Sequence, residues 1–330
     1  MRKALLPLIV LCLCVRGYGW AEEYSYDNGF YIGLGPNASH ISRQKSINYG
    51  FDKNSNPLRA TDVRDWAASP AARIGYKFDD ANSIALYGDW ARYSVGQSIG
   101  GLFAFEVVSV DGKVGSGSAT VASDIGVDIG WKSNVSNAGL EYQRKLWSGP
   151  LGGVLGLLGF KYRYEGQEFD VTTSSASFGA SFGTPLIDEL DERLREHLYG
   201  PYAGINLSFR PAHDSNFWIG VKTHVGYLFK SADFRARERF GVACFNDGLF
   251  CALKQNDHSS EGTVFTTVGL DLIYAITKGW SAGAVYEFNF IHKAAYISNN
   301  DKAFALGNAS KIENSAVYTN NIGLKLFYKF

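Results

Sequence analysis

The sequence has no apolar run long enough to form a transmembrane helix. Its one extended run spans residues 4–15, and mean hydropathy over the chain is −0.11. A helix that crosses a bilayer needs about 20 consecutive apolar residues. This absence excludes a helical inner-membrane protein.

An excess of positive charge is also lacking, because 32 Lys and Arg balance 32 Asp and Glu. Loss of an N-terminal leader would remove Arg2, Lys3 and Arg16 but no acid, which lowers the basic count to 29 against 32 acids. Nucleic-acid-binding domains carry a basic patch or stripe. No nucleic-acid partner is therefore expected.

Cysteine is scarce. Cys12 and Cys14 lie in the leader, so Cys244 and Cys251 alone remain in an exported chain. Two nearby cysteines in an oxidising compartment most often form a disulfide, which we predict here. The spacing offers too few ligands for a metal site, and neither a metal nor another cofactor is expected.

The N-terminus has the three parts of a signal peptide. Arg2 and Lys3 are followed by the apolar run, and Gly19 and Ala21 supply small residues at a cleavage site. We predict that residues 1–21 are removed and that residues 22–330 form a single exported domain.

The sequence does have segments in which apolar and polar residues alternate. In the last fourteen residues, one face is almost wholly apolar, with Tyr318, Asn320, Ile322, Leu324, Leu326, Tyr328 and Phe330. This two-residue period indicates a β-strand. The ending, with Tyr328 and the terminal Phe330, resembles the C-terminal assembly signal of bacterial outer-membrane barrels. The resemblance implies periplasmic chaperones and the barrel-assembly machinery as partners, and outer-membrane lipid and lipopolysaccharide as surroundings.

The same period recurs along the chain in ten segments, whose gaps alternate between short and long. The segments are 29–37, 71–78, 84–93, 135–145, 151–164, 198–209, 217–229, 263–275, 280–291 and 317–330. The sequence therefore predicts an all-β fold, a transmembrane antiparallel up-and-down β-barrel of about ten strands in the outer membrane of a Gram-negative bacterium. Short turns should be periplasmic, and long outer loops should span 38–66, 94–134, 165–197, 230–262 and 292–316.

Two of these loops contain further patterns. Residues 102–110 and 119–131 alternate and could form a hairpin, which would make twelve strands if it entered the membrane. Residues 185–197 place Leu186, Ile187, Leu190 and Leu194 at roughly helical spacing, which predicts a short surface helix.

The two faces of the predicted strands differ in chemistry. The outward faces carry no charge in segments 203–209, 221–229, 264–274 and 284–290, as a lipid-facing surface requires. The opposite faces supply the candidate pore-lining residues Arg73, Lys77, Asp89, Glu141, Lys145, Lys161, Arg163, Lys222, His224, Asp271, Glu287 and Lys325. Two interpretations stay open. Acids and bases such as Glu141 and Lys161 pair and plug the interior, or the basic excess lines a narrow pore with a weak preference for anions.

Groups of Asp, His or Ser residues typical of the active sites of outer-membrane enzymes are missing from the sequence. His224 lies beside Lys222 with no Ser or Asp neighbour in sequence, and the strand ends show no convincing Asp and His or His and Ser pair. We predict no enzymatic activity and assign no catalytic residue.

Residues 135–230 resemble the Legionella-type pore-forming major outer-membrane protein family. The resemblance is carried by Leu140 to Lys145 with Gly156 and Leu157, by Leu198 to Gly200 with Gly204, and by Gly220, Lys222, Gly226 and Tyr227. It implies a pore, and the expected function is narrow porin-like passage of small solutes or ions. The alternative is a closed structural barrel or a surface adhesin or antigen, whose Ser-, Gly- and Asn-rich outer loops contact a host or neighbouring-cell surface.

Overall fold

The protein is a closed antiparallel barrel of ten strands, as predicted. The computed structural model describes residues 29–42, 47–51, 57–60, 66–102, 125–175, 187–212, 214–277, 279–298 and 311–330. The barrel strands are β1 (Gly29–Ser42), β4 (Trp66–Lys77), β5 (Asn82–Leu102), β6 (Ile125–Gly149), β7 (Gly152–Ser175), β8 (Ile187–Phe209), β9 (Phe217–Phe240), β10 (Cys251–Ala275), β11 (Trp280–Ser298) and β12 (Lys311–Lys329). A separate two-stranded sheet pairs β2 (Ile47–Phe51) with β3 (Pro57–Ala60). Within the described residues, no helix is long and apolar enough to cross a membrane.

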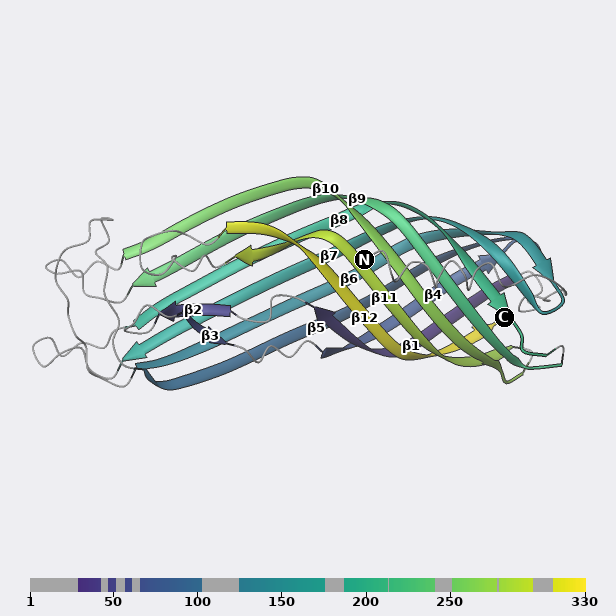
Figure 1. Ribbon diagram of the computed structural model, residues 1–330, viewed down its shortest axis with the longest axis horizontal. Helices are drawn as coiled ribbons and strands as arrows, with labels where there is room; N and C mark the ends of the chain where they lie inside the picture. Colours follow the sequence, from purple (N-terminus) through teal and green to yellow (C-terminus); the bar gives the residue numbers. More distant parts are fainter. Residues whose placement is uncertain are drawn as a thin grey trace, which may run out of the picture.

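Each barrel strand pairs with its neighbours in the chain, and β1 closes the sheet by pairing with both β4 and β12. Short turns join the strands at one end, which we call the turn end, where the C-terminus also lies (Figure 1). At the other end, the loop end, longer connections join them. The alternative of twelve strands is wrong, because β5 ends at Leu102, β6 begins at Ile125, and the two pair directly. The rest of the predicted hairpin, residues 103–124, lies outside the described residues.

The strands are much longer than a membrane requires. About 9–11 residues cross a bilayer as a tilted strand, whereas β6 has 25 residues and β9 has 24. Most of the predicted outer loops 165–197 and 230–262 is therefore strand, as are both ends of the predicted loop 94–134. Figure 1 shows β6 to β10 reaching far past β1 and β4 at the loop end, so that the barrel wall is uneven there.

The helix predicted within residues 185–197 is also wrong, because these residues belong largely to β8. Leu190, Leu194 and Leu198 are spaced by four, and this spacing fits one face of a helix as well as one face of a strand. Register decides the matter: Leu194 lies opposite Phe234 of β9 and opposite Gln167 of β7. The ladder on both sides holds the segment extended.

The outward face near the turn end is apolar, as predicted for a lipid-facing surface. Val225 is 57% exposed, Leu324 64% and Ile322 52%, although all three side chains are hydrophobic. Aromatic rings gather at the turn end, where Trp280 packs on Tyr328 and Tyr328 on Phe330, with ring centroids 4.6 and 4.9 Å apart. This arrangement is typical of the aromatic belt at a membrane interface.

Candidate functional site

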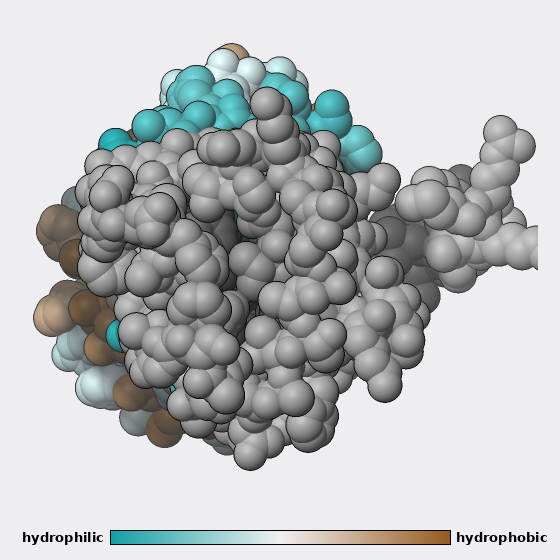
Figure 2. Space-filling view, turned by 90° about the vertical axis from the view of Figure 1, so that its left-hand side faces the viewer, coloured by the Kyte–Doolittle hydropathy of each residue, from teal (hydrophilic) through white to brown (hydrophobic). Residues whose placement is uncertain are grey.

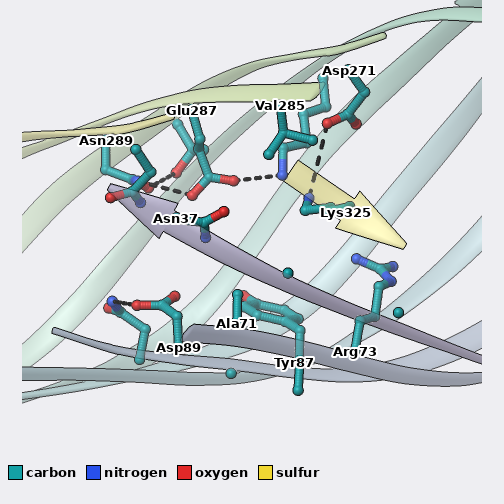
Figure 3. A pocket seen from close by; sticks show the side chains of 18 of the residues that line it. Asn37, Ala71, Arg73, Tyr87, Asp89, Asp271, Val285, Glu287, Asn289 and Lys325 are labelled. Carbon is teal, nitrogen blue, oxygen red and sulfur yellow. Dashed lines mark hydrogen bonds and ion pairs between the residues drawn. The ribbon is translucent and has the colours of Figure 1, made fainter. Parts of the chain in front are cut away.

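The interior near the middle of the barrel holds a layer of charged side chains, which we call the charged layer: Arg73, Glu141, Lys222, Asp271, Glu287 and Lys325. They come from β4, β6, β9, β10, β11 and β12 and line a cavity of about 100 Å³. Figure 3 shows Asp271, Glu287 and Lys325 on one side of this cavity and Arg73 with Asp89 on the other. Alternation places them inside, since every second residue of a barrel strand points inward.

Acids in the charged layer are paired with bases. Arg73 Nη2 donates to Glu141 Oε1 at 2.5 Å, and Lys222 Nζ donates to Glu287 Oε2 at 2.5 Å. The Nζ of Lys325 lies 3.9 Å from Asp271 Oδ1. Burial of a charge is costly unless it is paired, and pairing of this kind stabilises the interior.

Neutral polar groups complete these pairs. The hydroxyl of Tyr202 donates to Glu141 Oε2 at 3.0 Å, and His224 stacks on the Tyr202 ring with centroids 4.9 Å apart. Asn289 Nδ2 donates to Glu287 Oε1 at 2.9 Å. Each of the two acids is thus held by more than one donor, and the charged layer is a hydrogen-bonded network.

Between the charged layer and the loop end, the interior holds a hydrophobic cluster, beside which Arg163, Glu165 and Lys230 are also buried. We call this cluster the apolar layer: Ile41, Ala91, Tyr93, Trp131, Val135, Phe169, Leu198, Tyr202, Leu228, Phe265, Ile291, Ala294 and Val317, none more than 8% exposed. Nine barrel strands supply these residues, and Ala67 of the tenth, β4, packs against them. All ten strands therefore contribute to one hydrophobic cluster inside the barrel.

A glycine makes room for the largest ring of β10 in this layer. A Cβ atom built on Gly226 would lie 2.5 Å from the Phe265 ring, which is closer than such contacts occur. The missing side chain lets the ring lie against the backbone of β9, as aromatic residues do over glycine in barrels.

Further toward the loop end, hydrogen bonds join strands that are not neighbours in the wall. Glu196 Oε1 of β8 accepts from the backbone N–H of Ala295 in β11 at 2.6 Å. Gln167 Nε2 of β7 donates to the carbonyl of Ala295 at 3.1 Å. In the sheet, β9 and β10 separate β8 from β11. These contacts therefore bridge the interior and bring its walls together.

The predicted pore-lining residues are placed as follows. Nine of the twelve line the cavity of about 100 Å³. Lys77 lines a second cavity of about 180 Å³, nearer the turn end. Arg163 is 2% exposed and pairs with Glu165 at 3.1 Å, away from both. Lys145 lies at the turn end beside a register shift in the β6–β7 ladder.

The predicted pair of Glu141 and Lys161 does not form. Lys161 Nζ instead lies 3.4 Å from Asn289 Oδ1 and 4.9 Å from the centre of the Phe265 ring. Inward side chains of a narrow barrel can reach across the interior, so some partners, such as Arg73 and Glu141, come from strands that are not adjacent. Sequence neighbours are therefore poor guides to these pairs.

The apolar layer was missed from the sequence. Its signal is present, because Phe265, Ile291 and Val317 lie at or near the loop-side ends of the predicted segments 263–275, 280–291 and 317–330. Apolar residues at these inward positions break the polar pattern of the predicted lumen.

Other predictions fall outside what the structure tests. Cys244 lies outside the described residues, so its disulfide with Cys251 stays a prediction, as does the leader at residues 1–21. Tyr328 and Phe330 lie at the closing seam, where Phe330 N–H donates to the carbonyl of Phe30 at 3.1 Å. Among the described residues, no three His, Cys, Asp or Glu side chains are grouped to hold a metal ion.

No model of a known protein family matches the sequence, and no curated protein matches it. Solved structures do. The outer-membrane protease OmpT from Escherichia coli matches with a TM-score of 0.50 and 11% identity, over 92% of this chain and 97% of that one. The translocator domain of the autotransporter NalP from Neisseria meningitidis matches with a TM-score of 0.35 and 10% identity, over 100% and 95%. Ail, the attachment invasion locus protein of Yersinia pestis, matches with a TM-score of 0.25 and 12% identity, over 92% and 100%.

At such identities the likeness concerns the fold alone. The chain has the fold of an outer-membrane β-barrel. Membership of the Legionella-type family is not shown by these matches.

Proposed function

We propose that the protein is a closed barrel that acts at the cell surface through its outer end, as an adhesin or surface antigen. The observation that carries this proposal is the apolar layer, to which all ten strands contribute and in which no residue is more than 8% exposed. A hydrated ion would have to pass these packed side chains and lose most of its water, and hydrophobic constrictions close channels in this way.

The uneven wall supports the same proposal. Short turns face the periplasm in barrels of this type, which puts the loop end outside the cell. The strands β6 to β10 then raise a rigid wall well beyond the membrane (Figure 1). A binding surface on such a scaffold needs no passage through the barrel.

A narrow pore is the second candidate, and the two interior cavities favour it. The smaller is about 100 Å³ and the larger about 180 Å³, and Arg73, Lys222 and Lys325 line both. Passage would require the apolar layer to open. If it does, changing Lys161, Arg163 and Lys222 to Gln should reduce any preference for anions.

The deciding measurement is single-channel conductance of refolded residues 22–330 in a planar bilayer. We expect the native chain to be silent. A variant with Leu198→Ala, Leu228→Ala and Phe265→Ala empties the apolar layer and should give discrete steps, which shows that silence does not come from failed insertion. Val225→Ala with Val264→Ala, on the lipid face of the same strands, is the matched control and should stay silent. Reproducible steps from the native chain would support the pore instead.

Surface binding is tested separately. Cells that produce the barrel should adhere better to host or neighbouring bacterial surfaces than cells without it. Equal adherence on both kinds of surface would contradict the adhesin role, whatever the conductance.

A further inference from the structure

The outer side of the barrel wall carries four arginines beyond the membrane-facing region. Arg193 and Arg195 of β8 and Arg235 and Arg237 of β9 line a groove of about 560 Å³ together with Asp191, Asp233, Ala236 and Asn256. We call these four arginines the arginine patch. Figure 2 shows hydrophilic side chains gathered along the top of the molecule, the side on which β9 and β10 lie in Figure 1.

Register puts two of these like charges face to face. Arg193 lies directly opposite Arg235 in the β8–β9 ladder, while Arg237 faces Asp191 and Arg195 faces Asp233. Like charges directly opposite each other on one sheet face are destabilising. Arginine cannot relieve this by losing its proton. Asp191, which is bonded to Arg193, offsets part of the repulsion, and a bound anion would offset more of it.

The acids within the groove already have partners. Asp191 accepts from Nε and Nη2 of Arg193, at 3.0 and 3.1 Å. Asp233 Oδ1 lies 3.0 Å from Nδ1 of His258 on β10. Four arginines and two engaged acids line the groove, while Glu168 and Asp170 of β7 lie opposite Arg193 and Asp191 at its edge. The planar fork of arginine matches the oxygens of a phosphate group.

The position of the patch indicates which anion can reach it. On the same outward face, toward the membrane, stand Tyr199 of β8 and Tyr227 and Phe229 of β9, which are 44%, 46% and 52% exposed. Arg195 lies four residues from Tyr199, or about 13 Å along a strand. An amphiphile whose acyl chains lie against the apolar wall would place its headgroup beside the arginines.

We propose that the arginine patch binds the phosphate groups of an outer-leaflet glycolipid, lipopolysaccharide, from the side. The patch lies on the lateral wall, where lipid surrounds the barrel, and its aromatic neighbours continue the lipid-facing surface. This site goes beyond the surface function proposed above and holds whether the barrel is silent or conducting.

The test measures binding of lipopolysaccharide to the folded mature chain in nanodiscs. Arg193→Gln with Arg235→Gln should weaken binding about tenfold or more, since each hydrogen bond to a charged group contributes enough for such a change. The control, Arg92→Gln with Lys293→Gln, removes the same charge from exposed residues of β5 and β11 and should leave binding unchanged. Resistance of the folded barrel to unfolding by heat in detergent checks that both variants fold.

Two comparison ligands identify the source of the anion. Lipopolysaccharide stripped of its phosphates should bind the native chain as weakly as the intact lipid binds the arginine variant. Equal binding of intact lipid to native chain and arginine variant would overturn the proposal. So would patch-dependent binding of heparin, a soluble polyanion, without patch-dependent binding of the lipid.

Discussion

The membrane half and the outer half of the same strands have opposite polarity. On β9, Val225 and Phe229 point out toward lipid while Lys222 and His224 point into the interior. A few residues further on, Arg235 points out, and Ala232 and Phe234 point inward and are buried. One strand thus contains a lipid-facing segment with a polar interior, followed by a water-facing segment whose inward side chains are apolar at Ala232 and Phe234, next to the buried Lys230.

The surrounding solvent therefore decides which face of a strand is apolar. Where lipid surrounds the wall, apolar side chains gain nothing by turning inward, and charged groups are costly outside. Where water surrounds it, the hydrophobic effect favours the usual arrangement with an apolar core. At the crossing on β9, Tyr227, Leu228 and Phe229 are apolar in succession, because both faces need such residues there.

The interior of the outer half is where a substitution should cost most. Phe265 is 1% exposed in the apolar layer, and Phe265→Ala should lower the free energy of unfolding by about 3–5 kcal/mol through lost burial and the cavity left behind. Its neighbour Val264 faces lipid, and Val264→Ala should cost under about 1 kcal/mol. Urea unfolding of the barrel in liposomes measures both, and equal losses would contradict a packed apolar layer.

Placing an arginine at each of two outward positions tests the effect of the two solvents on stability. Val225 and Ser231 both point outward on β9, six residues apart. Val225→Arg should destabilise the barrel by about 2–4 kcal/mol because the charge faces hydrocarbon. Ser231→Arg should change stability by less than about 0.5 kcal/mol because it faces water. The same unfolding assay applies, and a large loss at Ser231 would mean that the membrane extends further up the wall.

The polar interior of the membrane half can be tested with its ion pair. Lys222→Met should cost about 1–3 kcal/mol, since Glu287 loses its cation. Adding Glu287→Leu should recover part of that loss, because both charges are then gone. The double-mutant cycle gives the coupling energy. A strictly additive result would show that the 2.5 Å pair contributes nothing to stability.

The smallest effect is expected outside both halves, in the turn between β4 and β5. Asp79 Oδ1 accepts from the backbone N–H of Ala81 and Asn82 at 2.7 and 2.8 Å, and the Asn82 side-chain amide lowers the pKa of this carboxyl below its ordinary value of 3.8. A lowered pKa stabilises the fold above the ordinary value, and the contribution is lost as the pH falls through the folded-state pKa.

Asp79→Asn removes that titration and keeps the shape of the side chain. As the pH falls below about 4, unfolding of the native barrel should therefore depend more steeply on pH than unfolding of the variant. Parallel pH profiles would show that the turn does not contribute. An NMR titration of Asp79 checks the pKa itself.

Much of the architecture followed from local pattern. The outward alternation in segments such as 263–275 and 317–330 predicted ten strands and their turns, and the structure confirms ten. The predicted strands are shorter than the observed ones. The reason is that the outward face becomes polar where the strands continue beyond the membrane. Residues 187–197 show the limit, since leucines spaced by four fit a helix and a strand alike and the ladder with β7 and β9 decides between them.

The interior was only half predictable. The inward residues Arg73 and Glu141 could be assigned from alternation, but not their pairing, because β5 separates their strands in the wall. The apolar layer draws on all ten strands, so it exists only after the barrel closes.

Local alternation is enough to predict a lipid-facing barrel and the side chains that point into it, because a two-residue period is a property of each strand alone. Only the closed sheet shows which inward side chains meet, where the polarity of the wall reverses, and that an apolar layer lies inside. These outcomes depend on contacts between residues far apart in the chain, and only closure of the sheet brings them together.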